Sequence, residues 1–157
     1  AHPHAFLAIN VIVGEAKLPP DNFSLLAQCL LQLNKAGQGS SRLLLHRLAA
    51  NHPQYFWACL SKCTDDADIA VFAEALFSAS FQAIPEAQEG EIVRTYRRNG
   101  TNAKLSLLQL FSRVAFPSPS LKLLVLKELE TESDPSVREV LKATVSSWVR
   151  QETVLHE

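Results

Sequence analysis

Two cysteines and two histidines between positions 46 and 63 are the residues whose spacing could hold a metal. Cys59 and Cys63 lie four residues apart, so a helix places both thiols on one face, with His52 and His46 upstream. A structural zinc site needs four such ligands, and a catalytic one needs three and a water. No further Cys or His pair follows at ligand spacing, and a helical cysteine among aromatic residues is typical of a small core side chain. We therefore expect no metal and no cofactor.

The cysteine pattern also bears on the compartment. The chain has three cysteines, an odd number without regular spacing, which argues against a disulfide framework. Free thiols are usual in the cytoplasm and nucleus, and we expect one of these two locations. The apolar runs are too short to span a bilayer, and no stretch has the pattern of a signal peptide. The sequence leaves the roles of Cys29, Cys59 and Cys63 open.

Acid–base and nucleophilic chemistry find little support. Ser40, Ser41 and Ser136 stand at expected helix starts. We expect their hydroxyls to accept hydrogen bonds from backbone amides as helix caps rather than to act as nucleophiles. No GxSxG, HExxH, Walker-type or GxGxxG motif occurs. Three carboxylates are close together, but we expect them on the solvated side and end of a helix: Glu128, Glu130 and Glu132. These observations predict a protein that is not an enzyme.

A basic cluster comprises Arg94, Arg97, Arg98 and Lys104. The three arginines end an expected helix, where cations complement the negative pole, so the structural interpretation is capping. The functional alternative is an anion site for phosphate, an acidic peptide or nucleic acid. Fifteen basic and sixteen acidic residues give a net charge of −1. That balance is untypical of a dedicated nucleic-acid binder.

The elements that would position these residues are helices. Apolar residues recur at helical spacing almost throughout, while glycine is scarce and hairpin dipeptides are absent. Clusters of Pro, Gly, Asn, Asp and Ser divide the pattern. We predict an all-α protein of about nine helices, at residues 3–15, 23–35, 42–50, 54–63, 67–81, 86–98, 103–116, 121–131 and 136–150.

Length and composition predict one domain. A chain of 157 residues that is 47% hydrophobic can bury a sizeable core, so we expect residues 1–157 to form a single helical domain. The segment 151–157 is expected to fray. The start at Ala1 and the lack of any Met favour a piece of a larger protein.

Residues 121–149 resemble a HEAT repeat. Two apolar helical patterns flank Ser133-Asp134-Pro135, and the second begins with Ser136-Val137-Arg138. HEAT repeats usually pair an Asp in this turn with an Arg or Lys in the first turn of the second helix. Asp134 and Arg138 match both positions. This is one well-matching unit of a HEAT-like or armadillo-like domain.

Three degenerate units precede it. Second helices aligned on this one start at positions 41, 69, 103 and 137, with differences of 28, 34 and 34. The position after each start holds Arg42, Ala70, Lys104 and Arg138, so the second unit departs from the family pattern. Over about residues 21–149 the resemblance implies an antiparallel helical-hairpin α-solenoid, a HEAT-like superhelix in which stacked pairs share a core. A non-repetitive all-α domain is the alternative.

The alignment also places polar residues on one shared face. Positions one, five and nine after each start form a mostly polar, net basic stripe across the second helices, which usually line the concave surface of a solenoid. Our predicted partner-binding residues there are Arg42, His46, Glu74, Lys104, Arg138, Lys142 and Ser146. The structural alternative is that Arg42, Lys104 and Arg138 tie units together.

The function we expect is therefore a protein–protein interaction module of a scaffold or adaptor. Its partner would be a peptide, another protein or neighbouring repeats of the same parent chain. Nucleic-acid or phosphoinositide binding through the basic cluster is one alternative, by analogy with superhelical adaptors such as ENTH, VHS and CID domains. An enzyme on a HEAT-like scaffold, as in alkylpurine DNA glycosylases, is another. The near-neutral charge and the lack of an acid–base constellation count against the enzyme.

Overall fold

The computed structural model describes residues 20–37, 39–79 and 83–156, and every regular element in these ranges is an α-helix. The helices are α2 (Pro20–Lys35), α3 (Gly39–Asn51), α4 (Pro53–Ser61), α5 (Asp66–Phe77), α6 (Glu86–Arg98), α7 (Thr101–Ser112), α8 (Pro119–Thr131) and α9 (Pro135–His156). The all-α prediction is confirmed for this part of the chain. The helix predicted at residues 3–15 lies outside the described residues.

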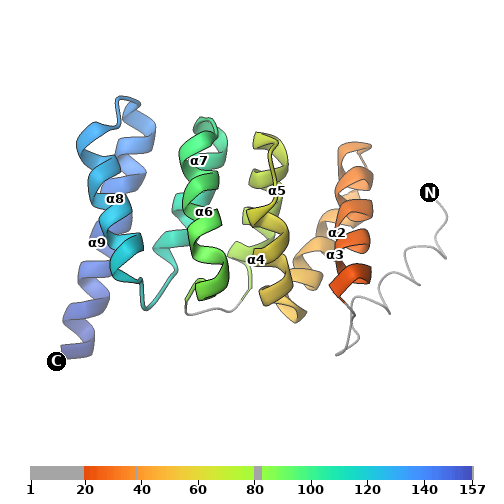
Figure 1. Cartoon of the computed structure of the whole chain (residues 1–157), viewed down its shortest axis with the longest axis horizontal. Coiled ribbons are helices and arrows are strands. Elements are labelled where there is room, and N and C mark those ends of the chain that lie inside the picture. Colours follow the sequence, from red (N-terminus) through yellow and green to blue (C-terminus); the bar gives the residue numbers. More distant parts are fainter. Residues whose placement is uncertain (1–19, 38, 80–82, 157) are drawn as a thin grey trace.

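The helices form two layers. Helices α2, α4, α6 and α8 pack in sequence order and make the first-helix layer, while α3, α5, α7 and α9 make the second-helix layer. Each first-layer helix also packs against the helix that follows it. Figure 1 shows these pairs succeeding one another along the long axis of the molecule. The second-helix layer therefore presents one continuous face built from four segments distant in sequence.

The core runs between the layers. Phe23 contacts Phe56 edge to face with ring centroids 5.9 Å apart, and Phe56 contacts Phe72 in the same way at 5.1 Å. Such edge-to-face pairs are favoured by the ring quadrupoles and join α2, α4 and α5. Trp57 and Trp148 are both buried in this core.

The breaks between helices follow the local sequence. Asp65 caps α5, because its carboxylate accepts the amides of Ala67 at 2.8 Å and Asp68 at 3.3 Å. Ser118 caps α8. Pro119 occupies the first helical position, where the N–H group that proline lacks would have no partner within the helix. The capping role predicted for Ser40, Ser41 and Ser136 is wrong. Helix α3 begins at Gly39 and α9 begins at Pro135, so the three serines lie inside the first turns of their helices. Asp134 accepts from the amide and the hydroxyl of Ser136 and so caps α9 in its place.

Three predicted helix ends are also wrong. Helix α5 ends at Phe77 rather than at residue 81, and α7 ends at Ser112 rather than at residue 116. At the first of these ends the Ser78 hydroxyl donates to the carbonyl of Ala75 at 2.9 Å and so satisfies a terminal acceptor. The segment predicted to fray instead continues α9 to His156. An ion pair of 2.6 Å between Glu152 and Lys122 holds this extension against α8.

Hydrogen bonds of regular sequence separation join successive pairs. On the first-helix layer, Arg98 donates to the carbonyl of Cys63 at 3.4 Å. On the second, the Trp148 indole donates to the carbonyl of Phe111 at 3.1 Å, and the hydroxyl of Ser147 donates to that of Ser112 at 3.1 Å. These partners are 35, 37 and 35 residues apart. The same kind of contact therefore recurs from one pair to the next.

Candidate functional site

Two adjoining hollows lie on the second-helix layer, over α3, α5 and α7. The smaller has a volume of about 90 Å³ and the larger about 250 Å³. Val71 and Glu74 of α5 line both, so the two form one feature, which we call the Glu74 groove. Its remaining lining residues are Asn34, Arg42, Leu45 and His46 around the smaller hollow, and Ala70, Ala73, Phe77, Ser106 and Gln109 around the larger.

Two polar contacts cross from α3 to α5 beside the groove. Arg42 forms an ion pair with Glu74, and His46 Nδ1 lies 3.1 Å from Ser78 Oγ. Each helix contributes residues four apart, which helical geometry places on one face. The structure therefore brings together three of the predicted partner-binding residues, Arg42, His46 and Glu74. The ion-paired side chains are 57% and 48% exposed, so both remain open to solvent.

His46 is held in its neutral form near pH 7. Burial lowers the pKa of His46, and the positive charge of Arg42 lowers it further. Ser78 Oγ lies 3.1 Å from His46 Nδ1 and 2.9 Å from the carbonyl of Ala75, and the direction of its contact with Nδ1 depends on the tautomer of the imidazole. The imidazole thus serves as a neutral hydrogen-bonding wall of the groove.

Phe77 is a groove residue that the sequence did not single out. Its side chain is large and apolar, yet it is 41% exposed. The guanidinium of Arg113 lies 4.9 Å from its ring centroid, a cation–π geometry. Ser106 and Gln109 were also missed. They belong to helical positions that the alignment gave no reason to single out, because the shape of the groove depends on the packing of α5 against α7.

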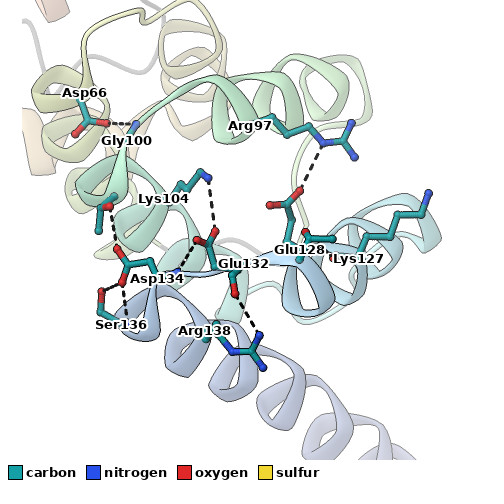
Figure 2. Close-up of polar contacts among 12 residues, drawn as sticks. Asp66, Arg97, Gly100, Lys104, Lys127, Glu128, Glu132, Asp134, Ser136 and Arg138 are labelled. Atoms are coloured by element: carbon teal, nitrogen blue, oxygen red, sulfur yellow. Dashed lines mark hydrogen bonds and ion pairs between the residues drawn. The ribbon is translucent and has the colours of Figure 1, made fainter.

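Lys104 and Arg138 lie elsewhere, at the junction of α7, α8 and α9 (Figure 2). Lys104 Nζ is 3.6 Å from Glu132 Oε2 and 5.5 Å from the Tyr96 ring centroid. Arg138 donates to the carbonyl of Glu132 at 3.2 Å. Asp134 accepts the amide of Ser136 at 2.9 Å and the hydroxyl of Thr101 at 3.2 Å. These contacts favour the structural alternative for Lys104 and Arg138, that of residues that tie units together.

Lys142 and Ser146 are exposed on α9 and line neither hollow of the groove. Lys142 pairs with Glu139 of its own helix at 3.1 Å. The predicted stripe is therefore not one continuous depression over the described helices: its α3 and α5 members form the groove, and its α9 members stand apart.

The basic cluster is largely occupied by contacts within the chain. Arg94 pairs with Glu91 at 3.0 Å, and Arg97 lies 4.0 Å from Glu128, as Figure 2 shows for the latter pair. Arg98 donates to the Cys63 carbonyl. Together with the Lys104 contact, these pairings give each of the four predicted anion-binding cations a partner. These contacts are ion pairs and a hydrogen bond to another helix pair rather than the predicted caps of the α6 end, where Asn99 donates to the Thr95 carbonyl at 2.7 Å. Anion binding stays a prediction.

Two of the three carboxylates that were predicted to lie on a solvated face, Glu128 and Glu132, are instead mostly buried. The side chains of Glu128 and Glu132 are only 19% and 11% exposed, because α6 and α7 supply their cationic partners. Burial raises the pKa of Tyr96, and the charges of both carboxylates add to that shift. Glu130 is exposed, as predicted. This cluster is thus a junction between helices.

The cysteines do not converge on a metal site within the described chain. Cys59 and Cys63 are buried, and the Cys63 thiol donates to the carbonyl of Cys59 at 3.4 Å. Burial, followed by the charge of Asp68, raises the pKa of Cys63 to about 12. Cys29 is exposed. Nowhere in residues 20–37, 39–79 and 83–156 do three or more His, Cys, Asp or Glu side chains gather as metal ligands.

A third hollow, of about 380 Å³, lies at the other end of the second-helix layer. Its lining residues come from the end of α9 and the segment after α7: Ala115, Phe116, Arg150, Gln151 and Val154. Phe116 and Val154 are 58% and 71% exposed. None of the predicted site residues lines it, so it is separate from the groove.

The described helices include none that is long and apolar enough to cross a membrane. No protein-family model matches this chain, and neither does any curated protein or solved structure.

Proposed function

We propose that this protein is a non-enzymatic interaction module of a scaffold or adaptor, which binds a partner protein along the Glu74 groove. The observation that carries the proposal is the groove itself. It combines an apolar floor at Ala70, Ala73 and Phe77 with a half-exposed ion pair and hydrogen-bonding side chains at its rim. An apolar anchor point surrounded by polar groups is the usual composition of a protein-binding surface.

We infer that the two layers form a HEAT-like α-solenoid. The recurring hydrogen bonds between pairs, 35 to 37 residues apart, support a repeated unit. Asp134 and Arg138 both make contacts at the turn where HEAT repeats place them, which supports the resemblance in position, although Arg138 donates to the Glu132 carbonyl and not to Asp134. On this interpretation the groove lies on the concave face formed by the second helices.

The His46–Ser78 pair supports binding rather than catalysis. A serine nucleophile donates its hydroxyl hydrogen to the histidine, and a carboxylate stabilises the resulting imidazolium. Here Ser78 Oγ lies within hydrogen-bond distance of the Ala75 carbonyl as well as of His46, and the charge that lowers the pKa of His46 is the cation of Arg42. No carboxylate among the described residues makes a hydrogen bond to His46. The pair is better suited to hold α3 and α5 together.

The proposal predicts that charge changes on the second-helix layer abolish partner capture. The intact chain, immobilised and exposed to an extract of its native cells, should retain a defined set of proteins identified by mass spectrometry. The double variant His46→Glu/Lys142→Glu should lose that set. Lys142 is exposed and His46 is half-buried, and only His46 lines the groove, so each single variant then shows which part of the face carries the interaction.

The matched control is Arg94→Glu, a similar charge reversal on the first-helix layer, where the side chain is 68% exposed. It should leave capture unchanged. Circular dichroism and thermal unfolding verify that each variant is folded. Capture that is unaltered in the double variant contradicts binding through this face. Loss in the Arg94 variant instead would favour the alternative, binding through the basic cluster.

A further inference from the structure

The connection between α6 and α7 consists of two residues, Asn99 and Gly100. An asparagine followed by glycine is the pair most prone to spontaneous deamidation, because glycine has no side chain to hinder attack by its backbone nitrogen. That nitrogen bonds to Cγ of the asparagine, the bond from Cγ to Nδ2 breaks, and ammonia leaves with the hydrogen of the backbone N–H. Water then opens the cyclic imide to aspartate or isoaspartate.

The fold holds these two residues in a geometry that does not allow the ring to close. A five-membered ring requires the Gly100 nitrogen and Asn99 Cβ to eclipse each other about the Cα–C bond. Asn99 has φ −109° and ψ 170°, at which these two atoms are staggered. Its side-chain amide also donates to the carbonyl of Thr95 at 2.7 Å, which holds the reactive group at the end of α6. Ring closure therefore requires the Asn99 backbone to rotate.

Two further hydrogen bonds oppose that rotation, because both of them hold Gly100. Its amide donates to Asp66 Oδ1 at 2.9 Å, a contact that Figure 2 shows between α5 and the connection. Its carbonyl accepts the amide of Lys104 at 3.0 Å. The bond to Asp66 is charge-assisted and joins residues 34 apart, so it exists only while α5 is packed beside α7. Asp66 thus couples the reactivity of Asn99 to the packing of two helix pairs.

Deamidation would remove the contact that positions Asn99. A carboxylate has no hydrogen to donate, so an aspartate at this position cannot bond to the Thr95 carbonyl. Its negative charge would also lie at the carboxyl end of α6, where the helix dipole disfavours an anion. Isoaspartate in addition lengthens the main chain by one carbon, in a connection of only two residues. Both products therefore disfavour the return of Gly100 to Asp66.

We propose that Asn99 is a deamidation site that the contact between Gly100 and Asp66 suppresses in the packed fold. When α5 separates from the connection, Asn99 cyclises, and the products hinder the connection from closing again. The modification is thereby a lasting record of local opening between the second and third helix pairs. It is independent of the proposed function, because none of these residues lines the Glu74 groove.

The test follows deamidation of Asn99 in the intact chain at neutral pH, by mass spectrometry of its proteolytic peptides. Isoaspartate is identified by enzymatic methylation of its carboxylate. The folded parent should convert much more slowly than the parent in denaturant. Asp66→Ala should accelerate conversion of the folded chain about tenfold, the ratio that corresponds to the loss of one hydrogen bond to a charged group.

Three controls separate this effect from general instability. In denaturant the parent and Asp66→Ala should convert at the same rate, because the contact exists in the folded state alone. Glu86→Ala, which removes an exposed carboxylate from the first turn of α6, should convert like the parent when folded. Trp148→Phe, which weakens the contact between α7 and α9, should convert more slowly than Asp66→Ala.

Three results would overturn the inference. One is an equal rate in the folded parent and in the denatured parent, since the fold would then give no protection. Another is an equal rate in the folded parent and in Asp66→Ala, or an acceleration as large in Trp148→Phe. The third is a deamidated chain whose thermal unfolding matches that of the parent, because its connection would then have closed again.

Discussion

Replacing Trp148 by Phe should weaken the fold by removing a link between α9 and α7. The indole is 5% exposed and donates to the carbonyl of Phe111 at 3.1 Å. That carbonyl also accepts the amide of Val114 at 3.0 Å, so it is not orphaned by the change. The expected cost is therefore that of a lost hydrogen bond and of lost apolar contact, without the penalty for a buried unsatisfied acceptor.

The magnitude follows from these two contributions. A net hydrogen bond contributes about 0.5–1.5 kcal/mol. A benzene ring in the place of an indole leaves on the order of 40 Å² of apolar surface without contact, or about 1 kcal/mol at 25 cal/mol per Å². Together they lower the free energy of unfolding by about 1.5–2.5 kcal/mol. For a domain of this size that corresponds to a fall in Tm of about 3–10 °C.

The assay is chemical and thermal unfolding, followed by circular dichroism. Val149→Ala is the matched control on the same helix, because Val149 is 56% exposed and its truncation should change stability by less than about 0.5 kcal/mol. If Trp148→Phe is as stable as this control, the indole does not hold α9 against α7, and the packing of the last pair is wrong.

Three further predictions concern single groups. The pKa of His46 is lowered in the fold, so the unfolded chain binds more protons near and below pH 6.5, and stability should fall as the pH drops through that window. His46→Gln should flatten this part of the pH–stability profile, and NMR titration should place the His46 midpoint below 6.5. Exposed Cys29 should react with a thiol reagent much faster than Cys63, whose pKa is raised to about 12, and unfolding should remove the difference. Hydrogen bonds from Ser136 lower the pKa of Asp134, so the stability from this cap is present at neutral pH and is lost as the pH falls through the folded pKa; Asp134→Asn should remove that acid-side dependence.

The helices were predictable because their causes are local. Apolar spacing of 3.6 residues, proline, and capping side chains act within a few positions, which is why α6 was predicted with its observed bounds and the break at Ser133-Asp134-Pro135 was found. The errors fell where a local signal was weak. The predicted fraying of residues 151–157 was one such error. The ion pair that holds this segment joins Glu152 to Lys122, 30 residues away, and cannot be predicted from the sequence of the segment itself.

The site was predictable only in part. The alignment of second helices placed Arg42, His46 and Glu74 on one face, and these residues do lie together. It also placed Lys104 and Arg138 there, but both are held at the junction of α7, α8 and α9 by the carboxylate and carbonyl of Glu132. Periodicity gives the angular position of a residue on its own helix and no information about which neighbour covers it.

The sequence alone was thus enough to predict where the described chain is helical and where most of its helices break. Tertiary structure alone decided which residues of these helices are open to a partner. The exposure of Phe77, the burial of Glu128 and Glu132, and the two hollows on either side of Glu74 all depend on how α5 and α7 pack against their neighbours. The physical reason is that burial and ion pairing are set by contacts between residues about thirty positions apart, whereas helix formation is set within a single turn.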